Sequence, residues 1–218
     1  MKVLVTGGAG YIGSQMVYSL LDAGYDVSII DNLSTGYQSN VPDNIEFLEY
    51  NIGAGEKVTN FLRQNKFDAV FHFAASIKVE ESEKNPLKYY QNNFCETQSF
   101  LASCIAADVD KFIFSSTAAV YGDKSKNLSS ETDPLKPNNT YGLTKMFCEK
   151  MIEGVSNAHN IKYCNLRYFN VAGSDKLLRC GQRNKKPTHL ISVATHASLG
   201  LIDYIPVYGT DYNTKDGS

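Results

Sequence analysis

The N-terminal stretch Lys2-Val-Leu-Val-Thr6, followed at once by Gly7-Gly-Ala-Gly-Tyr-Ile-Gly13, decides the fold of this chain. An apolar β-branched run, a glycine turn and the start of a helical pattern succeed one another without a gap. In this context a glycine motif indicates dinucleotide binding, because the glycines let backbone N–H groups reach a pyrophosphate at a helix N-terminus. The motif therefore predicts cofactor contacts at Gly7, Gly10, Tyr11, Ile12 and Gly13.

A second signal lies at the end of the next expected strand, Asp26–Ile30, where Asp31 follows Gly13 by eighteen residues. A carboxylate at this place can accept hydrogen bonds from both adenosine ribose hydroxyls and repels a 2′-phosphate, which favours NAD over NADP. The alternatives are a glycine turn without a ligand and a carboxylate that only caps its strand. The complete strand–turn–helix–strand context makes both of them weaker.

Composition excludes several other classes of protein. The net charge of −2 gives no basic footprint for nucleic acid, and no apolar run approaches the ~20 residues that span a bilayer. The N-terminus is a strand rather than a secretion signal, so we expect a cytoplasmic protein. The cysteines lack metal-ligand spacing and are expected to be reduced, with no metal site: Cys95, Cys104, Cys148, Cys164 and Cys180.

Strand and helix patterns alternate along most of the chain. Strands are expected at 2–6, 26–30, 45–50, 69–73, 111–115 and 161–167, and helices at 12–23, 56–64, 89–107 and 141–156. This alternation predicts an α/β fold, a Rossmann-type doubly wound parallel sheet with helices on both faces. Residues 1–170 would form the NAD-binding domain, and 171–218 an incomplete substrate-binding region with a helix at 188–200 and a short strand at 206–209.

The stretch Thr140-Tyr-Gly-Leu-Thr-Lys145 carries the predicted chemistry. Tyr141 and Lys145 are four residues apart and share one helix face. A neighbouring ammonium lowers the pKa of a phenol, so the pair could act as a general base and acid near neutral pH. Such pairs also occur by chance on solvated helices.

Hydroxyl side chains end the preceding strand. Ser115, Ser116 and Thr117 lie there, and a hydroxyl beside the tyrosine can share a proton with a substrate alcohol. The alternative is ordinary strand-end hydrogen bonding, which we favour for Ser116.

The chain resembles the extended short-chain dehydrogenase/reductases and, within them, the UDP-glucose 4-epimerases. The stretches that carry the resemblance span nearly the whole chain: Thr6–Gly13, Ile30–Asn32, His72–Ala75, Asn85–Asn93, Ser115–Gly122, Tyr141–Lys145 and Arg167–Asn170. Thr188–Leu190 and Val207–Gly209 also resemble the uridine-binding part of that family.

The resemblance implies a mechanism. Tyr141 would take the proton from the sugar O4 while NAD takes hydride from C4, and Lys145 would lower the Tyr141 pKa and hold the nicotinamide ribose. Thr117 would bridge Tyr141 and the sugar. Further implied cofactor contacts are Asn32, Asn51, Ile52, Phe73, Ala74, Ala75, Asn93, Ser115 and Phe169, and implied sugar-nucleotide contacts are Asn170, Leu190 and Tyr208. The family's dimers pair two helices that resemble Asn93–Ala107 and Tyr141–Ser156, so a homodimer is expected.

Two departures qualify the resemblance. Asn51 stands where the family usually has an aspartate facing the adenine. The chain also ends where the family continues to an arginine-containing diphosphate clamp, so we expect a truncated epimerase. Ala118-Ala119, by contrast, argues against a related dehydratase, which carries an Asp-Glu pair there. A UDP-uronate or UDP-pentose 4-epimerase and a catalytically silent NAD-binding protein remain the alternatives.

Overall fold

The computed structural model describes residues 1–123, 128–183, 188–207, 209–211, 215 and 217. A parallel sheet runs through it in the order β3-β2-β1-β4-β5-β6, which is a dinucleotide-binding strand order and confirms the expected fold class. Its strands are β1 (Lys2–Thr6), β2 (Asp26–Asp31), β3 (Glu46–Glu49), β4 (Ala69–His72), β5 (Lys111–Ser115) and β6 (Lys162–Leu166). The chain reverses direction across the sheet between β1 and β4, where ligands bind in such folds.

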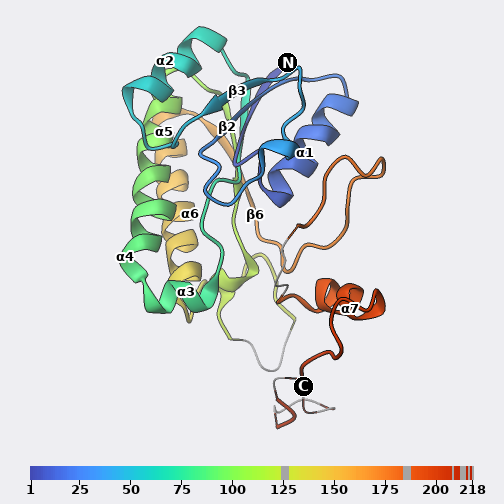
Figure 1. Ribbon diagram of the computed structural model, residues 1–218. Coiled ribbons are helices and arrows are strands. Elements are labelled where there is room, and N and C mark those ends of the chain that lie inside the picture. The colour runs from blue at the N-terminus through green and yellow to red at the C-terminus, as the bar shows by residue number, and fades with distance from the viewer. Residues whose placement is uncertain (124–127, 184–187, 208, 212–214, 216, 218) are drawn as a thin grey trace.

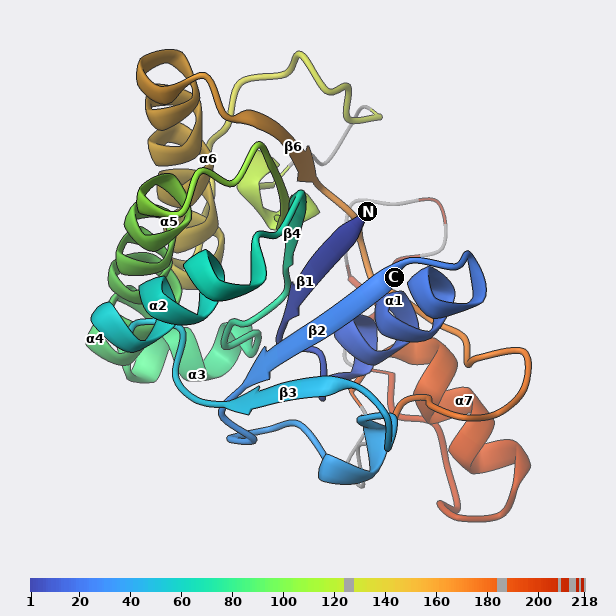
Figure 2. The ribbon, with the colours of Figure 1, turned by 90° about the horizontal axis from the view of Figure 1, so that it is seen from above.

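Helices cover both faces of this sheet (Figures 1 and 2). Helix α1 (Tyr11–Asp22) lies on one face, and α2 (Glu56–Asn65), α5 (Glu96–Ala106) and α6 (Thr140–His159) lie on the other. The sheet has a hydrophobic core on each face, because successive side chains of a strand point to opposite faces. Val3 and Val5 of β1 pack in the cluster that includes Val17 of α1. Leu4, between them, packs in the cluster that includes Leu62 and Ile152.

The single helix expected over 89–107 is in fact composite. Helix α4 (Pro86–Tyr89) runs into a π-helical segment, η2 (Tyr90–Cys95), and then into α5. The preceding short helix α3 (Val79–Lys84) was not expected from the sequence. It ends at Lys84, and Asn85, with a φ of −133°, leaves the helical region as residues before a proline tend to do. The π segment matters for the site because it carries the buried Asn93.

The region after β6 lies along α1. The Tyr11 hydroxyl donates to the Gly173 carbonyl at 2.7 Å, and Arg179 donates two hydrogen bonds to Asp22, at 2.8 and 2.6 Å. Helix α7 (Leu190–Ser198) follows and confirms the expected helix. The short 3₁₀ turns η1 (Gln38–Asn40) and η3 (Ala118–Tyr121) complete the elements.

The strand expected over 206–209 is wrong for the residues of it that the structure describes, which are 206, 207 and 209. Pro206 has no N–H to donate, and a strand this short gains little without a neighbour to pair with. In the part of the chain that is described, no helix combines the length and apolar character needed to cross a membrane.

Candidate active site

The glycine turn brings the ends of β1 and β4 into close contact. Gly7 has a φ of +70°, and a Cβ added to it would lie 2.6 Å from the Ala74 backbone nitrogen. A Cβ on Gly13 would lie 2.1 Å from the Gly7 carbonyl oxygen, so α1 can approach the turn only because that position is glycine. Gly10 begins α1 without a side-chain cap, which leaves N–H groups of the first turn free for an anion. The backbone therefore fits a pyrophosphate.

Asp31 lies at the end of β2 beside this turn, as predicted. Its carboxylate accepts hydrogen bonds from the backbone nitrogens of Ala9, at 3.0 Å, and Leu33, at 2.8 Å. Burial raises the Asp31 pKa, and the two backbone hydrogen bonds oppose that shift. Each carboxylate oxygen has a second lone pair, so Asp31 can still accept hydrogen bonds from ribose hydroxyls.

Other predicted cofactor residues form the rim of the same region. Asn32 and Asn51 each close a local turn, with Asn32 Oδ1 accepting from Ser34 at 3.0 Å and Asn51 Oδ1 accepting from Gly53 at 2.7 Å. Ile52 is buried behind Asn51 in the main core. The chain leaves β4 through Phe73, Ala74 and Ala75, which are all half-buried.

Asn93 holds the loop that follows β4. Its side-chain oxygen accepts from the Ser76 nitrogen at 2.8 Å, and its side-chain nitrogen donates to the Ser76 carbonyl at 2.9 Å. Both ends of this buried amide are thus used within the protein. The structure assigns Asn93 a loop-closing role, and its direct contact with a cofactor stays a prediction.

Tyr141, Lys145 and Thr117 meet at the carboxyl end of β5. Thr117 lies close enough to the Tyr141 side chain to lower its pKa, and Lys145 Nζ donates to the Ser115 carbonyl at 2.8 Å. Helix α6 starts where it does because the Asn139 side chain caps it by accepting from the Gly142 nitrogen at 2.8 Å. The cap fixes Tyr141 in the first turn, one turn before Lys145.

The pKa of Tyr141 differs from the expectation. Burial raises it to about 12, and the Thr117 hydrogen bond only partly opposes the rise. Lys145 is not among the causes of that shift, since with a pKa of about 8 it is neutral at the pH where this phenol ionises. Burial also lowers the Lys145 pKa to about 8. The predicted lowering of the Tyr141 pKa by Lys145 is therefore absent from this structure.

Several residues at this site were missed by sequence reasoning. The Tyr168 hydroxyl lies 2.5 Å from Ser115 Oγ, and the buried His72 lies between the hydroxyls of Thr6, at 2.7 Å, and Thr97, at 3.0 Å. Both lie within stretches that carried the family resemblance, which was the only signal for them. Burial lowers the pKa of His72 to about 3, so it is neutral near pH 7.

The predicted sugar-nucleotide contacts Asn170 and Leu190 are exposed, as is the predicted cofactor contact Phe169, and Tyr208 lies outside the described residues. These contacts stay predictions.

Comparison with known proteins agrees with this geometry. Residues 3–216 match the model of the NAD dependent epimerase/dehydratase family. A UDP-glucose 4-epimerase of Azospirillum brasilense is 45% identical over all of this chain, which spans 62% of that relative.

Solved structures give the same result. The Brucella ovis UDP-glucose 4-epimerase in complex with NAD is 41% identical with a TM-score of 0.92, and the match covers 99% of this chain and 66% of that one. The UDP-Glc/GlcNAc 4-epimerase of Campylobacter jejuni is 43% identical with a TM-score of 0.84, covering 100% of this chain and 68% of the other. The chain thus spans about two thirds of its relatives' length, and it belongs to the NAD dependent epimerase/dehydratase family.

Proposed function

We propose that the protein carrying this chain interconverts UDP-galactose and UDP-glucose by NAD-dependent epimerisation at C4. The observation that carries the proposal is the meeting of Tyr141, Thr117 and Lys145 at the sheet edge that also bears the glycine turn. The relatives named UDP-glucose 4-epimerase support the choice of substrate.

The chain's own residues account for binding and proton transfer. The glycine turn would hold the NAD pyrophosphate and Asp31 the adenosine ribose, and NAD when bound supplies the hydride acceptor and donor. In its phenolate form, Tyr141 would take the proton from the sugar O4 beside the Thr117 hydroxyl, and with the loss of a hydride from C4 this would leave a 4-keto sugar. Lys145 orients this end of the site from its bond to Ser115. Tyr141 returns the proton after the sugar presents its other face.

A coupled assay of the complete gene product tests this proposal. UDP-galactose should be converted to UDP-glucose without added NAD being consumed. Parallel reactions with UDP-N-acetylgalactosamine, UDP-glucuronate and UDP-arabinose identify a different sugar preference. A protein that binds NAD but turns over none of these would be catalytically silent, and the proposal would then be wrong.

Cofactor choice gives a prediction that this chain can decide. We expect NAD to bind about 100-fold more tightly than NADP, because a 2′-phosphate would meet the Asp31 carboxylate in a partly dry site. Asp31→Asn keeps one carbonyl acceptor and removes the charge, so it should reduce that preference to about 10-fold or less. Isothermal titration calorimetry with both nucleotides measures the ratios. Equal affinities in the unaltered chain would refute this role of Asp31.

We also propose a homodimer in the cytoplasm, paired through α5 and α6. Phe147 of α6 is 38% exposed and packs against Tyr90 and Phe94 of the π segment, with ring centroids 6.4 and 6.0 Å apart. An exposed aromatic side chain that packs on two half-buried ones is typical of a protein interface. The five cysteines are free, which suits a reducing compartment.

Sedimentation velocity of the complete gene product checks the dimer. We expect a dimer at micromolar concentration and a monomer for Phe147→Glu, because a buried unpaired carboxylate opposes association. Glu153→Gln, an exposed change on the same helix, is the control. A monomer at high micromolar concentration before any substitution would exclude the proposed pairing.

A further inference from the structure

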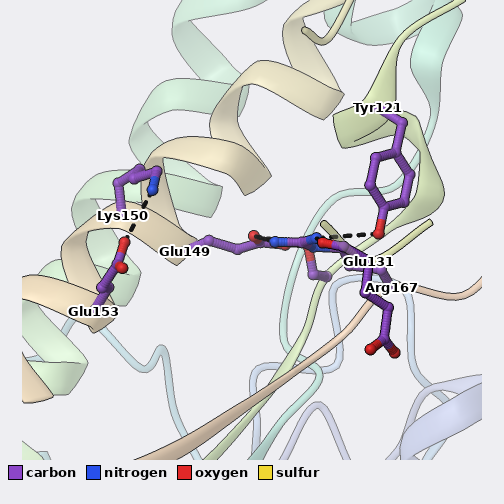
Figure 3. A network of polar contacts seen from close by, with 7 residues as sticks. Tyr121, Glu131, Glu149, Lys150, Glu153 and Arg167 are labelled. Carbon is purple, nitrogen blue, oxygen red and sulfur yellow. Dashed lines mark hydrogen bonds and ion pairs between the residues drawn. The ribbon is translucent and has the colours of Figure 1, made fainter. Parts of the chain in front are cut away.

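A buried carboxylate on α6 lies directly behind the proposed active site. Glu149 follows Lys145 by one helical turn and Tyr141 by two, and its side chain is only 3% exposed. The Arg167 guanidinium donates to both of its oxygens, with Nε at 3.0 and 3.1 Å and Nη2 at 2.6 Å (Figure 3). A buried charge that is paired so fully is held in one geometry.

The same carboxylate accepts a hydrogen bond from the buried Ser116 hydroxyl. Two consecutive residues at the end of β5 are thereby tied to successive turns of α6. The Ser115 carbonyl accepts from Lys145 and Ser116 donates to Glu149, while the next residue, Thr117, lies beside Tyr141 and lowers its pKa. The hydrogen bond of Ser116 is therefore more than the ordinary strand-end bond that its sequence position suggests.

Arg167 extends the network to the turn beyond Thr117. Its Nη1 donates to the Tyr121 hydroxyl at 3.0 Å and to the Glu131 carbonyl at 3.2 Å (Figure 3). Tyr121 ends η3, the 3₁₀ turn that Thr117 caps by accepting from the Ala119 nitrogen at 3.1 Å. One guanidinium thus joins the end of β6, helix α6 and the turn that presents Thr117.

We propose that Glu149, held by Arg167, is a positioning residue for the proposed epimerase reaction. It sets the distance between the helix that carries Tyr141 and Lys145 and the strand end that carries Ser115 and Thr117. The inference rests on the proposed function for its effect on turnover. Small displacements of reacting groups cost large factors in rate, so a pair that fixes this distance matters even though it touches no substrate.

Stability and positioning can be separated by comparing single and double variants. Removing one partner leaves a buried unpaired charge, and this destabilises the fold whatever the pair does. Replacing both partners by apolar residues of similar size is often neutral or stabilising. Glu149→Met/Arg167→Met should therefore restore the melting temperature that Glu149→Met alone lowers. If the pair has a positioning role, turnover will not be restored with it.

The experiment uses the complete gene product and measures the melting temperature, kcat and KM. For the double variant we expect a melting temperature near that of the unaltered protein, a fall in kcat of about 10-fold or more, and a KM within about 3-fold. Ser116→Ala, which keeps the ion pair, should lower kcat several-fold at an unchanged melting temperature. Ser116→Ala tests the proposal by itself if the double variant does not fold.

Glu153→Gln is the matched control. Glu153 lies one turn after Glu149 on the same helix and forms an exposed ion pair with Lys150 at 2.9 Å (Figure 3). Exposed pairs of this kind contribute little, so the control should change neither kcat nor melting temperature. Full kcat in both the double variant and Ser116→Ala would overturn the proposal and leave the network a structural one.

A second readout does not depend on epimerase activity. The charged or titratable groups that act on the Lys145 ammonium are Glu149 and Cys148 on its own helix and His72 on β4. Loss of the Glu149 charge should lower the Lys145 pKa further, which NMR of its ε-methylene carbon follows. If the unaltered protein epimerises nothing, the proposed function fails. An unchanged Lys145 titration in the double variant would then separately overturn the role of Glu149.

Discussion

Tyr141→Phe is expected to lower turnover of UDP-galactose by at least ~100-fold, the usual scale for loss of a general acid or base. The phenol hydroxyl is the group whose pKa the neighbouring Thr117 lowers, and the substitution removes only this oxygen. The aromatic ring stays in the first turn of α6, so the fold and the glycine turn are unaffected. Steady-state kinetics of the complete gene product, together with calorimetric titration of NAD, measure both effects.

Cofactor affinity should stay within a few-fold in this variant. Tyr163→Phe is the control, because Tyr163 is a partly exposed phenol on β6, and it should keep full activity. Near-normal turnover by Tyr141→Phe would show that another group moves the O4 proton. Since burial holds the Tyr141 pKa at about 12, titration of the chain alone should find this phenol protonated at neutral pH.

Sequence alone predicted the sheet because buried parallel strands are nearly continuous apolar runs. The glycine motif fixed the first strand, turn and helix, and the alternation that followed fixed the remaining order. The π segment Tyr90–Cys95 could not be predicted in this way. A π segment is defined by i→i+5 backbone hydrogen bonds, and no residue type or spacing in this stretch predicts them.

The site was predicted where its residues are neighbours in sequence. Tyr141 and Lys145 share one helix face at a fixed spacing, and Thr117 follows the end of β5 by two residues. The electrostatics were not predicted, because burial depends on packing from several elements and spacing contains no information about it. Burial outweighs every neighbouring charge in setting the Tyr141 and Lys145 pKa values.

The Glu149–Arg167 pair lay beyond sequence reasoning for a related reason. Its members are 18 residues apart on a helix and at a strand end, a separation that no local pattern joins. Arg167 belonged to a stretch that resembled the family, but the resemblance named no partner for it. This pair can be identified only from the folded structure, in which the end of β6 lies beside α6.

Lys145→Met is expected to abolish most of the turnover and to make the fold more stable at neutral pH. Lys145 is 2% exposed, and burial lowers its pKa from 10.5 to about 8. Its charged form therefore costs roughly 3 kcal/mol of folding free energy at pH 7. Methionine removes that cost and also the hydrogen bond to the Ser115 carbonyl, worth about 1 kcal/mol. A net gain of about 2 kcal/mol in unfolding free energy should remain.

The free energy of unfolding should depend on pH because of this lysine, and the direction follows from its two pKa values. Between pH 8 and 10.5 the lysine is protonated in the unfolded chain and neutral in the folded one, so the unfolded state binds more protons. The contribution of Lys145 to the unfolding free energy of the unaltered chain therefore rises with pH across that window. It is lowest below pH 8. The advantage of Lys145→Met should shrink as pH rises and vanish at pH ~10, where the remaining cost of the charge has fallen to the ~1 kcal/mol of the lost hydrogen bond. Urea unfolding at pH 7 and pH 9.5 measures the difference between the two proteins.

Lys150→Met provides the control, because Lys150 is an exposed lysine on the same helix. It should show no pH-dependent difference from the unaltered chain between pH 7 and 9.5. A Lys145→Met variant that is less stable at pH 7, or whose advantage is independent of pH, would mean that the ammonium is well solvated or well paired in the fold. Loss of turnover together with a gain in stability would identify Lys145 as a group retained for function at a cost to the fold.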